Sequence, residues 1–426
     1  MIYKKFKEID EMYYEKTLKS GLRVILIPRS SYNKKYAVLS VNVGSVDLKL
    51  KDNSNIIYGF PQGTAHFMEH ILFENREGSI IDAFSQLGSS VNAYTSFNNT
   101  NYYFNAADNF YKSLNCLLSF VLKPHFDQNK IEHEKSVIKQ EIKMYEDSPS
   151  WQSFHQLLQG LYYKYPIKYN IAGTSQSVDK INREILEGFF NKYYNLDNMN
   201  LIVIGDINHE KLFDWLTDKF SNFGAEHVDF KKIYPEEPSG IRIKKNEIAM
   251  SISRPIITLG FKENRCFNDQ RKIVRHEMLS NMVLEMIFGK SNDNYHSLYD
   301  KNLIDENFTF NFLQEKNTGF AKIYGETSHI NQSINSIVDI INNWHRKINK
   351  DDFEIVKHKY IGRYFRSLNS LEALSSQVIK YLNLGQNYFD LINIIESISL
   401  KDIIDQYNKL LLDQEQVQII IRKISK

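Results

Sequence analysis

The segment "NREILEGFFNKYYNLDNMNLIVIGD", residues 182–206, aligns without gaps to "LKDIIDQYNKLLLDQEQVQIIIRKI", residues 400–424. Both segments predict a helix, then a polar turn, then a buried strand. The copies lie 218 residues apart, which is about half of the 426-residue chain. A short match of this kind also arises between unrelated helix-turn-strand segments, but the half-chain offset favours two duplicated domains.

A linker is predicted at residues 224–247, which hold two prolines, a Ser-Gly pair and dense charge between apolar segments. The sequence therefore predicts an N-terminal domain at residues 1–223 and a C-terminal domain at 248–426. A chain of this length suits two domains of about 200 residues each.

Hydrophobic periodicity in the first half predicts a mixture of strands and helices. The strands expected from alternation are a hairpin at 13–28, a strand at 36–46 and a strand at 100–107. The expected helices are one carrying residues 63–74 and others at 80–88, 109–122 and 128–146. This order is mixed α/β and not a regular βα repeat.

Composition excludes several classes of protein. Lysine plus arginine number 53 against 51 acidic residues, and the net charge of +2 gives no electrostatic case for binding nucleic acid. No stretch approaches the roughly 18 apolar residues of a membrane span, and the first residues lack the apolar core of a secretory signal. The two cysteines, Cys116 and Cys266, do not suggest a disulfide framework. We expect a soluble, cytoplasmic protein.

The motif "HFMEH", residues 66–70, predicts a metal site. On a helix, His66 and His70 lie one turn apart on the same face, so both imidazoles can reach one ion. Glu69 is angularly offset and can reach a water on that ion without being a ligand. Zinc with three protein ligands keeps a fourth position for water, whose proton a carboxylate can take during attack on a peptide carbonyl. The same pattern arises by chance in roughly one of fifty such chains as an ordinary surface helix, so a third ligand has to decide.

Two acidic residues are candidates for that ligand. Glu134 and Glu141 lie seven residues apart in "IEHEKSVIKQEIKMYED", residues 131–147, and hence only about 20° apart on a helix. A solvated acidic helix has the same pattern, and spacing alone does not choose between the two glutamates.

Several motifs in order, "GTAHFMEHILFE", "VNAYTSFNNTNYYF", "YNIAGTSQSVDKI" and "YYNLDNMNLIVIGDI", resemble the inverted-zincin peptidases of the M16 family. The resemblance is strongest to small bacterial M16B-type members related to mitochondrial processing peptidase. It implies an α/β fold of two homologous domains, each a mixed, largely antiparallel sheet flanked by helices. It also implies that His66, His70 and Glu141 bind Zn2+, that Glu69 is the general base, and that Glu134 supports the ligands.

The resemblance gives a role to residues that otherwise read as a polar turn between two strands. In the family, the strand that begins with Asn92 and Ala93 here is an exposed edge that pairs with an extended substrate. Asn92, Ala93, Tyr94 and Thr95 are therefore expected to bind substrate.

Two functions remain in competition. The first is a zinc endopeptidase that cleaves unfolded peptides or a leader segment, and the second is a non-catalytic scaffold or peptide-binding subunit. The enzyme is favoured because inactive family members lose the histidines or the glutamate, whereas all four of His66, Glu69, His70 and Glu141 are present.

Active members of the family also carry an arginine and, seven residues later, a tyrosine in the second domain. The best matching stretch here, "LYDKNLIDEN" at 298–307, has Tyr299 and Glu306 at these positions. We therefore hypothesise a heterodimer with a homologous chain that lacks the zinc motif but keeps the arginine and tyrosine. A homodimer that uses other donors is the alternative.

Overall fold

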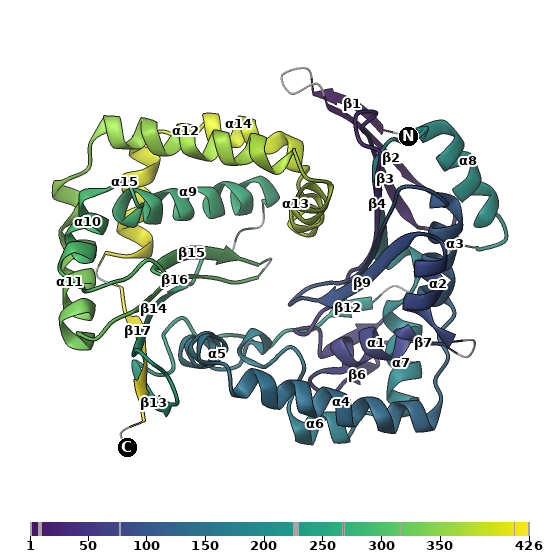
Figure 1. Ribbon diagram of the computed structural model, residues 1–426, viewed down its shortest axis with the longest axis horizontal. Helices are drawn as coiled ribbons and strands as arrows, with labels where there is room; N and C mark the ends of the chain where they lie inside the picture. The colour runs from purple at the N-terminus through teal and green to yellow at the C-terminus, as the bar shows by residue number, and fades with distance from the viewer. Residues whose placement is uncertain are drawn as a thin grey trace. The chain divides into compact units, whose positions relative to one another are not determined.

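The protein, seen in a computed structural model, divides into two compact units of helices and sheet (Figure 1). The structure describes residues 2–6, 11–75, 78–224, 230–265, 267, 269–315, 317–412 and 414–424. The first unit comprises Met1–Lys143, Tyr169–Pro235 and Ser370–Ile379, and the second comprises Met144–Lys168, Glu236–Asn369 and Lys380–Lys426. The predicted fold class is confirmed.

The units differ from the predicted domains by two exchanged segments. Residues 144–168 lie in the first half of the sequence but belong to the second unit, and residues 370–379 show the reverse. The predicted linker contains a short strand at Phe230–Lys232 and the first residues of another at Lys245–Met250. The domain limits at 223 and 248 remain a prediction about the duplicated sequences.

Strands and helices of the first unit follow the predicted order. The strands are β1 (Ile2–Phe6), β2 (Glu11–Thr17), β3 (Arg23–Pro28), β4 (Lys35–Val41), β5 (Lys49–Asp52), β6 (Ile57–Gly59), β7 (Glu74–Asn75), β8 (Gly78–Ser79), β9 (Ser89–Thr95), β10 (Thr100–Ala106), β11 (Met199–Gly205) and β12 (Phe230–Lys232). The helices are α1 (Thr64–Phe73), α2 (Ile80–Gln86), α3 (Phe110–Leu122), α4 (Gln128–Glu146), α6 (Ser175–Asp179), α7 (Arg183–Tyr193) and α8 (His209–Lys219). The expected hairpin, strands and helices of the first half are thus confirmed.

The main sheet of the first unit has the order β1-β2-β3-β11-β4-β10-β9. Only β3 and β11 are parallel, and the other neighbours are antiparallel. Alternate residues of the central strands form one core with the helices on that face. Examples are Leu39 and Leu201 from the sheet, which share this core with Phe67 of α1 and Leu117 of α3.

The second unit repeats this arrangement. Its strands are β13 (Lys245–Met250), β14 (Ile256–Glu263), β15 (Thr309–Gln314), β16 (Gly319–Glu326) and β17 (Gln416–Lys423). Its helices are α5 (Pro149–Leu161), α9 (Gln270–Phe288), α10 (Asp293–Asp300), α11 (Ile330–Asn343), α12 (Lys350–Ser367), α14 (Leu391–Glu396) and α15 (Leu400–Leu410), with α13 (Leu371–Asn383) divided between the units. The strand order β13-β17-β14-β16-β15 matches β3-β11-β4-β10-β9, and β13 and β17 are again the parallel pair.

The matched sequence segments occupy equivalent places in the two sheets. Residues 182–206 form α7 and β11, and residues 400–424 form α15 and β17. The two homologous domains implied by the sequence are therefore visible as a shared topology.

Helix α5 is packed closely on the sheet of the second unit. A Cβ atom added at Gly160 would lie 2.5 Å from Val417 Cγ1, and one added at Gly260 would lie 2.3 Å from Leu157 Cδ1. The hydroxyl groups of Ser153 and Thr258 are 2.5 Å apart. In the first unit the exchanged segment 370–379 supplies Ser376, which shares a hydrogen bond with Tyr94 of β9.

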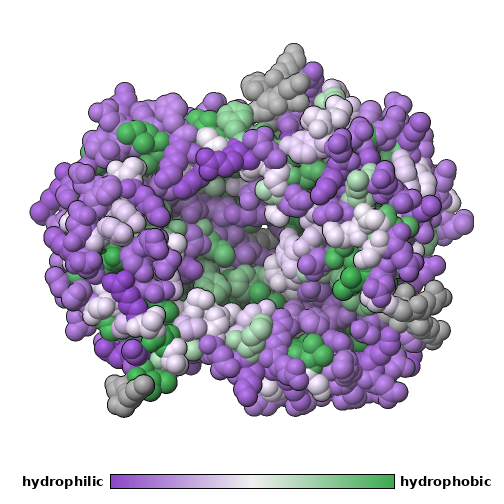
Figure 2. Space-filling view, viewed as in Figure 1, coloured by the Kyte–Doolittle hydropathy of each residue, from purple (hydrophilic) through white to green (hydrophobic). Residues whose placement is uncertain are grey.

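Hydrophilic side chains dominate the face of the molecule shown in Figure 2. In the described part of the chain, no helix is both long enough and apolar enough to cross a bilayer.

Candidate metal centre

Helix α1 begins at a glycine that the local backbone requires. Gly63, which precedes the helix, has φ of 87°, a conformation that residues with a Cβ rarely adopt. A Cβ at this position would also lie 2.4 Å from the carbonyl oxygen of Ala172. The motif around Gly63 and the "NIAGT" segment around Ala172 are therefore packed against each other at the start of the helix.

The rotation of α1 is fixed by its apolar residues. Phe67, Met68 and Ile71 are buried in the core of the first unit. With that face packed inward, His66 and His70 lie together on the neighbouring face, and their ring centroids are 4.6 Å apart. The one-turn spacing predicted from the sequence is confirmed.

Helix α4 brings both candidate carboxylates to these histidines. Ile131, Ile138 and Ile142 bury one side of α4 and so determine which residues face α1. Glu134 is 6% exposed, and its Oε2 lies 3.0 Å from Nδ1 of His70. Glu141, seven residues further along the same face, approaches both histidines.

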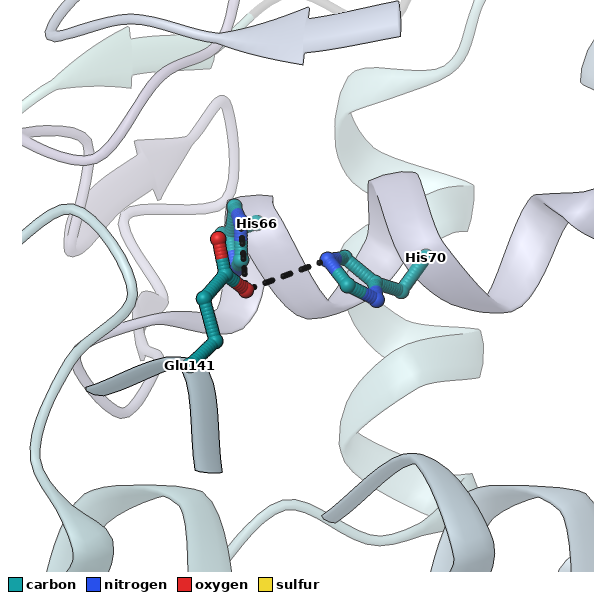
Figure 3. Close-up of side chains that lie close together, drawn as sticks. All are labelled: His66, His70 and Glu141. Carbon is teal, nitrogen blue, oxygen red and sulfur yellow. Dashed lines mark ion pairs between the residues drawn. The ribbon is translucent and has the colours of Figure 1, made fainter. Parts of the chain in front are cut away.

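Three side chains converge as Figure 3 shows. Oε2 of Glu141 is 3.6 Å from Nε2 of His66 and 3.5 Å from Nε2 of His70. One ligand atom from each of the three residues lies within 4.8 Å of the other two, so the group could hold a metal ion. Glu134 binds the other nitrogen of His70, an arrangement that fixes the orientation of that ring.

The pKa values of the two histidines move in opposite directions. Burial lowers the pKa of His66 to about 4, with a further contribution from neighbouring His70. Burial also disfavours the charged form of His70, but hydrogen bonds to Glu134 and Glu141 outweigh it and raise the pKa of His70 to about 9. The carboxylates of Glu134 and Glu141 thus favour the charged form of His70, whereas burial favours the neutral form of His66.

Glu69 lies on α1 beside this group and contacts the adjacent strand β9. The hydroxyl group of Thr95 donates a hydrogen bond of 2.5 Å to Oε2 of Glu69. Burial raises the pKa of Glu69, and the hydrogen bond from Thr95 partly opposes this effect. A carboxylate with a raised pKa next to a candidate metal site suits a group that accepts a proton.

The expected substrate-binding residues lie in β9, which is the last strand in the order of the main sheet. Ala93 and Thr95 are partly buried, whereas Asn92 and Tyr94 are more exposed. Oδ1 of Asn92 accepts a hydrogen bond of 2.8 Å from the backbone N–H of Ala93. Strand β9 contacts α1, and within it the hydroxyl group of Thr95 binds the Glu69 carboxylate.

The remaining residues named from the sequence are Tyr299, Glu306 and the two cysteines. Tyr299 is 45% exposed on α10 and stacks on Tyr295, and Glu306 is exposed before β15. Cys116 is a free thiol, and Cys266 lies outside the described residues.

Comparison with known proteins identifies the family. Residues 23–175 match the family model described as Insulinase (Peptidase family M16), and residues 180–360 match the model described as Peptidase M16 inactive domain. The zinc protease YmfH of Bacillus subtilis (strain 168) is 32% identical over 400 residues, which cover 93% of this chain and 94% of that protein. The chain therefore belongs to peptidase family M16.

Two further relatives agree with this assignment. The M16-like peptidase from Alicyclobacillus acidocaldarius superposes with a TM-score of 0.91 and 26% identity, covering 97% of this chain and 99% of that chain. Mitochondrial-processing peptidase subunit beta of Dictyostelium discoideum is 25% identical over 266 residues, or 61% of this chain and 50% of that protein. The family resemblance seen in the sequence is confirmed.

Sequence reasoning missed the contact between Thr95 and Glu69. The residues of β9 alternate between two faces, and this alternation could have placed Ala93 and Thr95 on the same side. The strand pattern does not say which helix packs against that side, so the partner of Thr95 was not predictable.

Proposed function

We propose that this chain is a zinc-dependent endopeptidase that cleaves unfolded peptides or a leader segment. The observation that carries the proposal is the convergence of His66, His70 and Glu141, with Glu69 on the same helix. Membership of a family whose relatives are named zinc proteases supports it.

Zinc fits the donor set of the site. Two imidazole nitrogens and one carboxylate oxygen are among its usual ligands, and bond lengths of about 2.0–2.2 Å in tetrahedral geometry place ligand atoms about 3.3–3.6 Å apart. The separations of 3.6 and 3.5 Å between Glu141 and the two histidines agree with this spacing. Three protein ligands leave a position for water or substrate.

Glu69 and Glu134 have different roles in the proposed hydrolysis. When bound, zinc supplies Lewis acidity that polarises the substrate carbonyl and lowers the pKa of water to about 7. Glu69 takes the proton of the attacking water and delivers it to the leaving amine nitrogen. Glu134 holds Nδ1 of His70, so that Nε2 faces the metal position.

Strand β9 is the proposed substrate platform. An extended peptide that pairs with its outer edge gains backbone hydrogen bonds from a strand adjacent to α1. Such pairing uses backbone groups more than side chains of the peptide. It therefore suits unfolded segments, whose backbone groups are available. Asn92, Ala93 and Tyr94 are the residues that we assign to this contact.

The active enzyme is proposed to contain two M16-type subunits. A tyrosine and a glutamate, Tyr299 and Glu306, replace the donors expected in the second domain, and a carboxylate cannot donate to an oxyanion while ionised. The relative named a subunit of mitochondrial-processing peptidase supports a paired arrangement. A homodimer with other donors is the alternative, and the cytoplasmic location stays a prediction.

The test of the function uses purified chain, zinc and a quenched fluorescent peptide library. We expect metal-dependent cleavage that a chelator removes and zinc restores. The alternative, a peptide-binding scaffold, predicts binding of the same peptides with no hydrolysis under any metal or partner condition.

The subunit proposal has its own test. A double variant, Tyr299→Arg with Glu306→Tyr, restores the donors and should raise the activity of the chain alone. A homologous chain that carries this arginine and tyrosine should activate the wild-type chain. Full activity of the wild-type chain alone, unchanged by either measure, contradicts the heterodimer.

A further inference from the structure

The contact between β9 and α1 links the proposed substrate strand to the proposed base. Thr95 is the last residue of β9, and its Oγ1 lies 2.5 Å from Oε2 of Glu69. This distance is typical of a hydroxyl that donates to a carboxylate. We propose that Thr95 is a positioning residue that holds the Glu69 carboxylate in the orientation needed for proton transfer. The inference rests on the function proposed above.

A glutamate that acts as a base needs such a restraint. Its side chain has several rotatable bonds, and each alternative rotamer carries the carboxylate away from the proton that it must accept. The hydrogen bond to Oε2 favours one rotamer, and a backbone hydrogen bond from Thr95 to the same carboxylate adds to this restraint. The pair resembles that of Glu134 and His70, in which one residue orients another that acts at the metal position.

Thr95 is itself fixed by the hairpin that contains it. It is paired with Thr100 of β10, and the N–H of Ser96 donates to the carbonyl of Asn99 at 2.8 Å across the turn. The hydroxyl of Ser96 also binds the Asn99 side chain. A neighbouring loop holds the turn, since the N–H of Ser45 donates to Ser96 O at 3.0 Å and Val46 N–H donates to Phe97 O at 3.1 Å.

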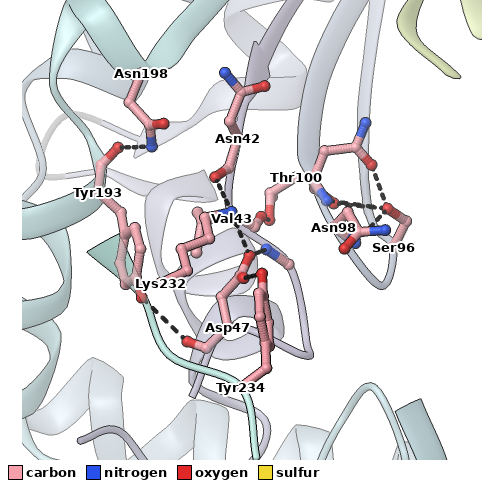
Figure 4. Close-up of polar contacts among 12 residues, drawn as sticks. Asn42, Val43, Asp47, Ser96, Asn98, Thr100, Tyr193, Asn198, Lys232 and Tyr234 are labelled. Carbon is pink, nitrogen blue, oxygen red and sulfur yellow. Dashed lines mark hydrogen bonds and ion pairs between the residues drawn. The ribbon is translucent and has the colours of Figure 1, made fainter. Parts of the chain in front are cut away.

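That loop is anchored by a buried carboxylate (Figure 4). Asp47 is 1% exposed and accepts hydrogen bonds from Gly44 N–H at 2.9 Å, Lys232 at 2.8 Å and Tyr234 at 2.7 Å. A Cβ at Gly44 would lie 2.4 Å from the Phe97 carbonyl, so the loop lies against the turn with no space between them. The backbone that carries the Thr95 hydroxyl is therefore held by hydrogen bonds and close packing on the side of the turn.

The alternative role of Thr95 is direct contact with substrate, as the sequence suggested. The two roles differ in kinetics. A substrate contact that is equal in ground and transition states raises KM when removed, whereas a misplaced base lowers kcat and leaves KM unchanged.

The experiment compares Thr95→Val with Thr95→Ser in the full-length chain, saturated with zinc and assayed under the condition that supports wild-type cleavage. Valine keeps the shape of threonine but lacks the hydroxyl group, whereas serine keeps it. Thr17→Val, at an exposed position of β2 in the same sheet, is the control. We expect kcat to fall about 10–100-fold for Thr95→Val with KM within about threefold, and serine and Thr17→Val to stay near wild type.

A second readout does not depend on activity. In crystal structures of the zinc-free proteins, the Glu69 carboxylate should hold one orientation in wild type and in Thr95→Ser, and several in Thr95→Val. Unchanged kcat in Thr95→Val, or a rise in KM alone, overturns the proposal. If wild type cleaves no peptide, the proposed function fails, and a single Glu69 orientation in Thr95→Val then overturns the positioning role separately.

Discussion

Helices α1 and α9 occupy the same place in the order of elements, the first between β4 and β9 and the second between β14 and β15. Their buried polar residues are neutralised in different ways. In α9, Glu277 pairs with Lys380, and Glu285 pairs with Lys359 and Arg363. In α1, the histidines face the carboxylates of α4 and one another.

Helices α1 and α9 differ in what balances their buried charges. In the second unit each of these buried carboxylates has a lysine or arginine partner, so the charge is compensated by the protein itself. In the first unit the ligand atoms of His66, His70 and Glu141 converge, so that a bound cation could balance the negative charge of the carboxylate. The duplicated fold thus places a candidate metal site on α1, whereas Glu277 and Glu285 of α9 are paired with basic side chains.

The last strands of the two main sheets, β15 and β9, also differ in how their backbone groups are hydrogen-bonded. On β15, the side chain of Asn281 from α9 binds both the N–H of Phe312 at 2.9 Å and the carbonyl of Phe312 at 3.0 Å. Asn281 thereby satisfies the groups that an added strand would use. On β9, the N–H of Ala93 donates to the side chain of the adjacent residue, Asn92.

The largest expected effect is a loss of kcat that occurs for a variant of α1 and not for a variant of α9. Glu69→Gln should reduce kcat by about 10²–10⁴-fold with zinc retained, because the amide cannot accept the proton. Glu277→Gln, on α9, should lower stability but leave kcat per folded molecule unchanged. Kinetics and metal analysis of both variants check this. Equal kcat losses in the two variants would contradict the division of roles.

Metal retention should distinguish the two carboxylates of α4. Glu141→Gln should weaken zinc binding most, because it alters a proposed ligand. Glu134→Gln should weaken binding by about 10–100-fold, because it only loosens the orientation of His70. Competition with a chromophoric chelator measures both affinities, with wild type as reference. Stronger dependence on Glu134 than on Glu141 would reverse the assignment.

Acid stability should depend on the second unit. Glu263 is buried, but hydrogen bonds from His276 and Arg265 outweigh burial and lower the pKa of Glu263 to about 2. Since the folded pKa lies below the ordinary value, this stabilisation is present above about pH 4.5 and is lost as the pH falls toward 2.

Glu263→Gln tests this dependence. The variant should lose about 3 kcal/mol of unfolding free energy at pH 7 and much less near pH 2. Urea unfolding of wild type and variant across this range measures the difference, with exposed Glu396→Gln as control. A difference that does not change between pH 5 and pH 2 is the contrary result.

The smallest expected effect concerns the closed edge of β15. Asn281→Ala removes two hydrogen bonds and should cost about 1–2 kcal/mol of stability. Exchange of the Phe312 amide hydrogen should accelerate, while zinc content and kcat stay at wild-type values. Asn92→Ala provides the comparison on β9. Continued protection of Phe312 would show that Asn281 does not close this edge.

Many helices and strands of the first unit were predictable because hydrophobic periodicity and proline positions mark them within the sequence. Helix α4 ends where Pro149 follows, and the alternation in β3 and β4 survives in the folded sheet. Helical spacing also placed His66 and His70 on one face of α1 and the two glutamates on one face of α4, whereas the family resemblance brought the two helices together. These features depend on periodicity within one segment.

Features that depend on packing partners were not predictable. The amphipathic pattern of α5 predicts a buried face but does not say that this face packs on β14, a strand more than 90 residues further along the chain in the same unit. Likewise, nothing near Thr95 or Asn281 indicates that one contacts Glu69 and the other Phe312. Such contacts are set by tertiary structure.

The most direct test of the central claim is an anomalous difference map, measured at the zinc absorption edge from crystals of the zinc-loaded protein. We expect one strong peak per chain, next to His66, His70 and Glu141, and none beside α9. Zinc bound elsewhere in the chain, or a well-ordered site with no peak between these three residues, would contradict it.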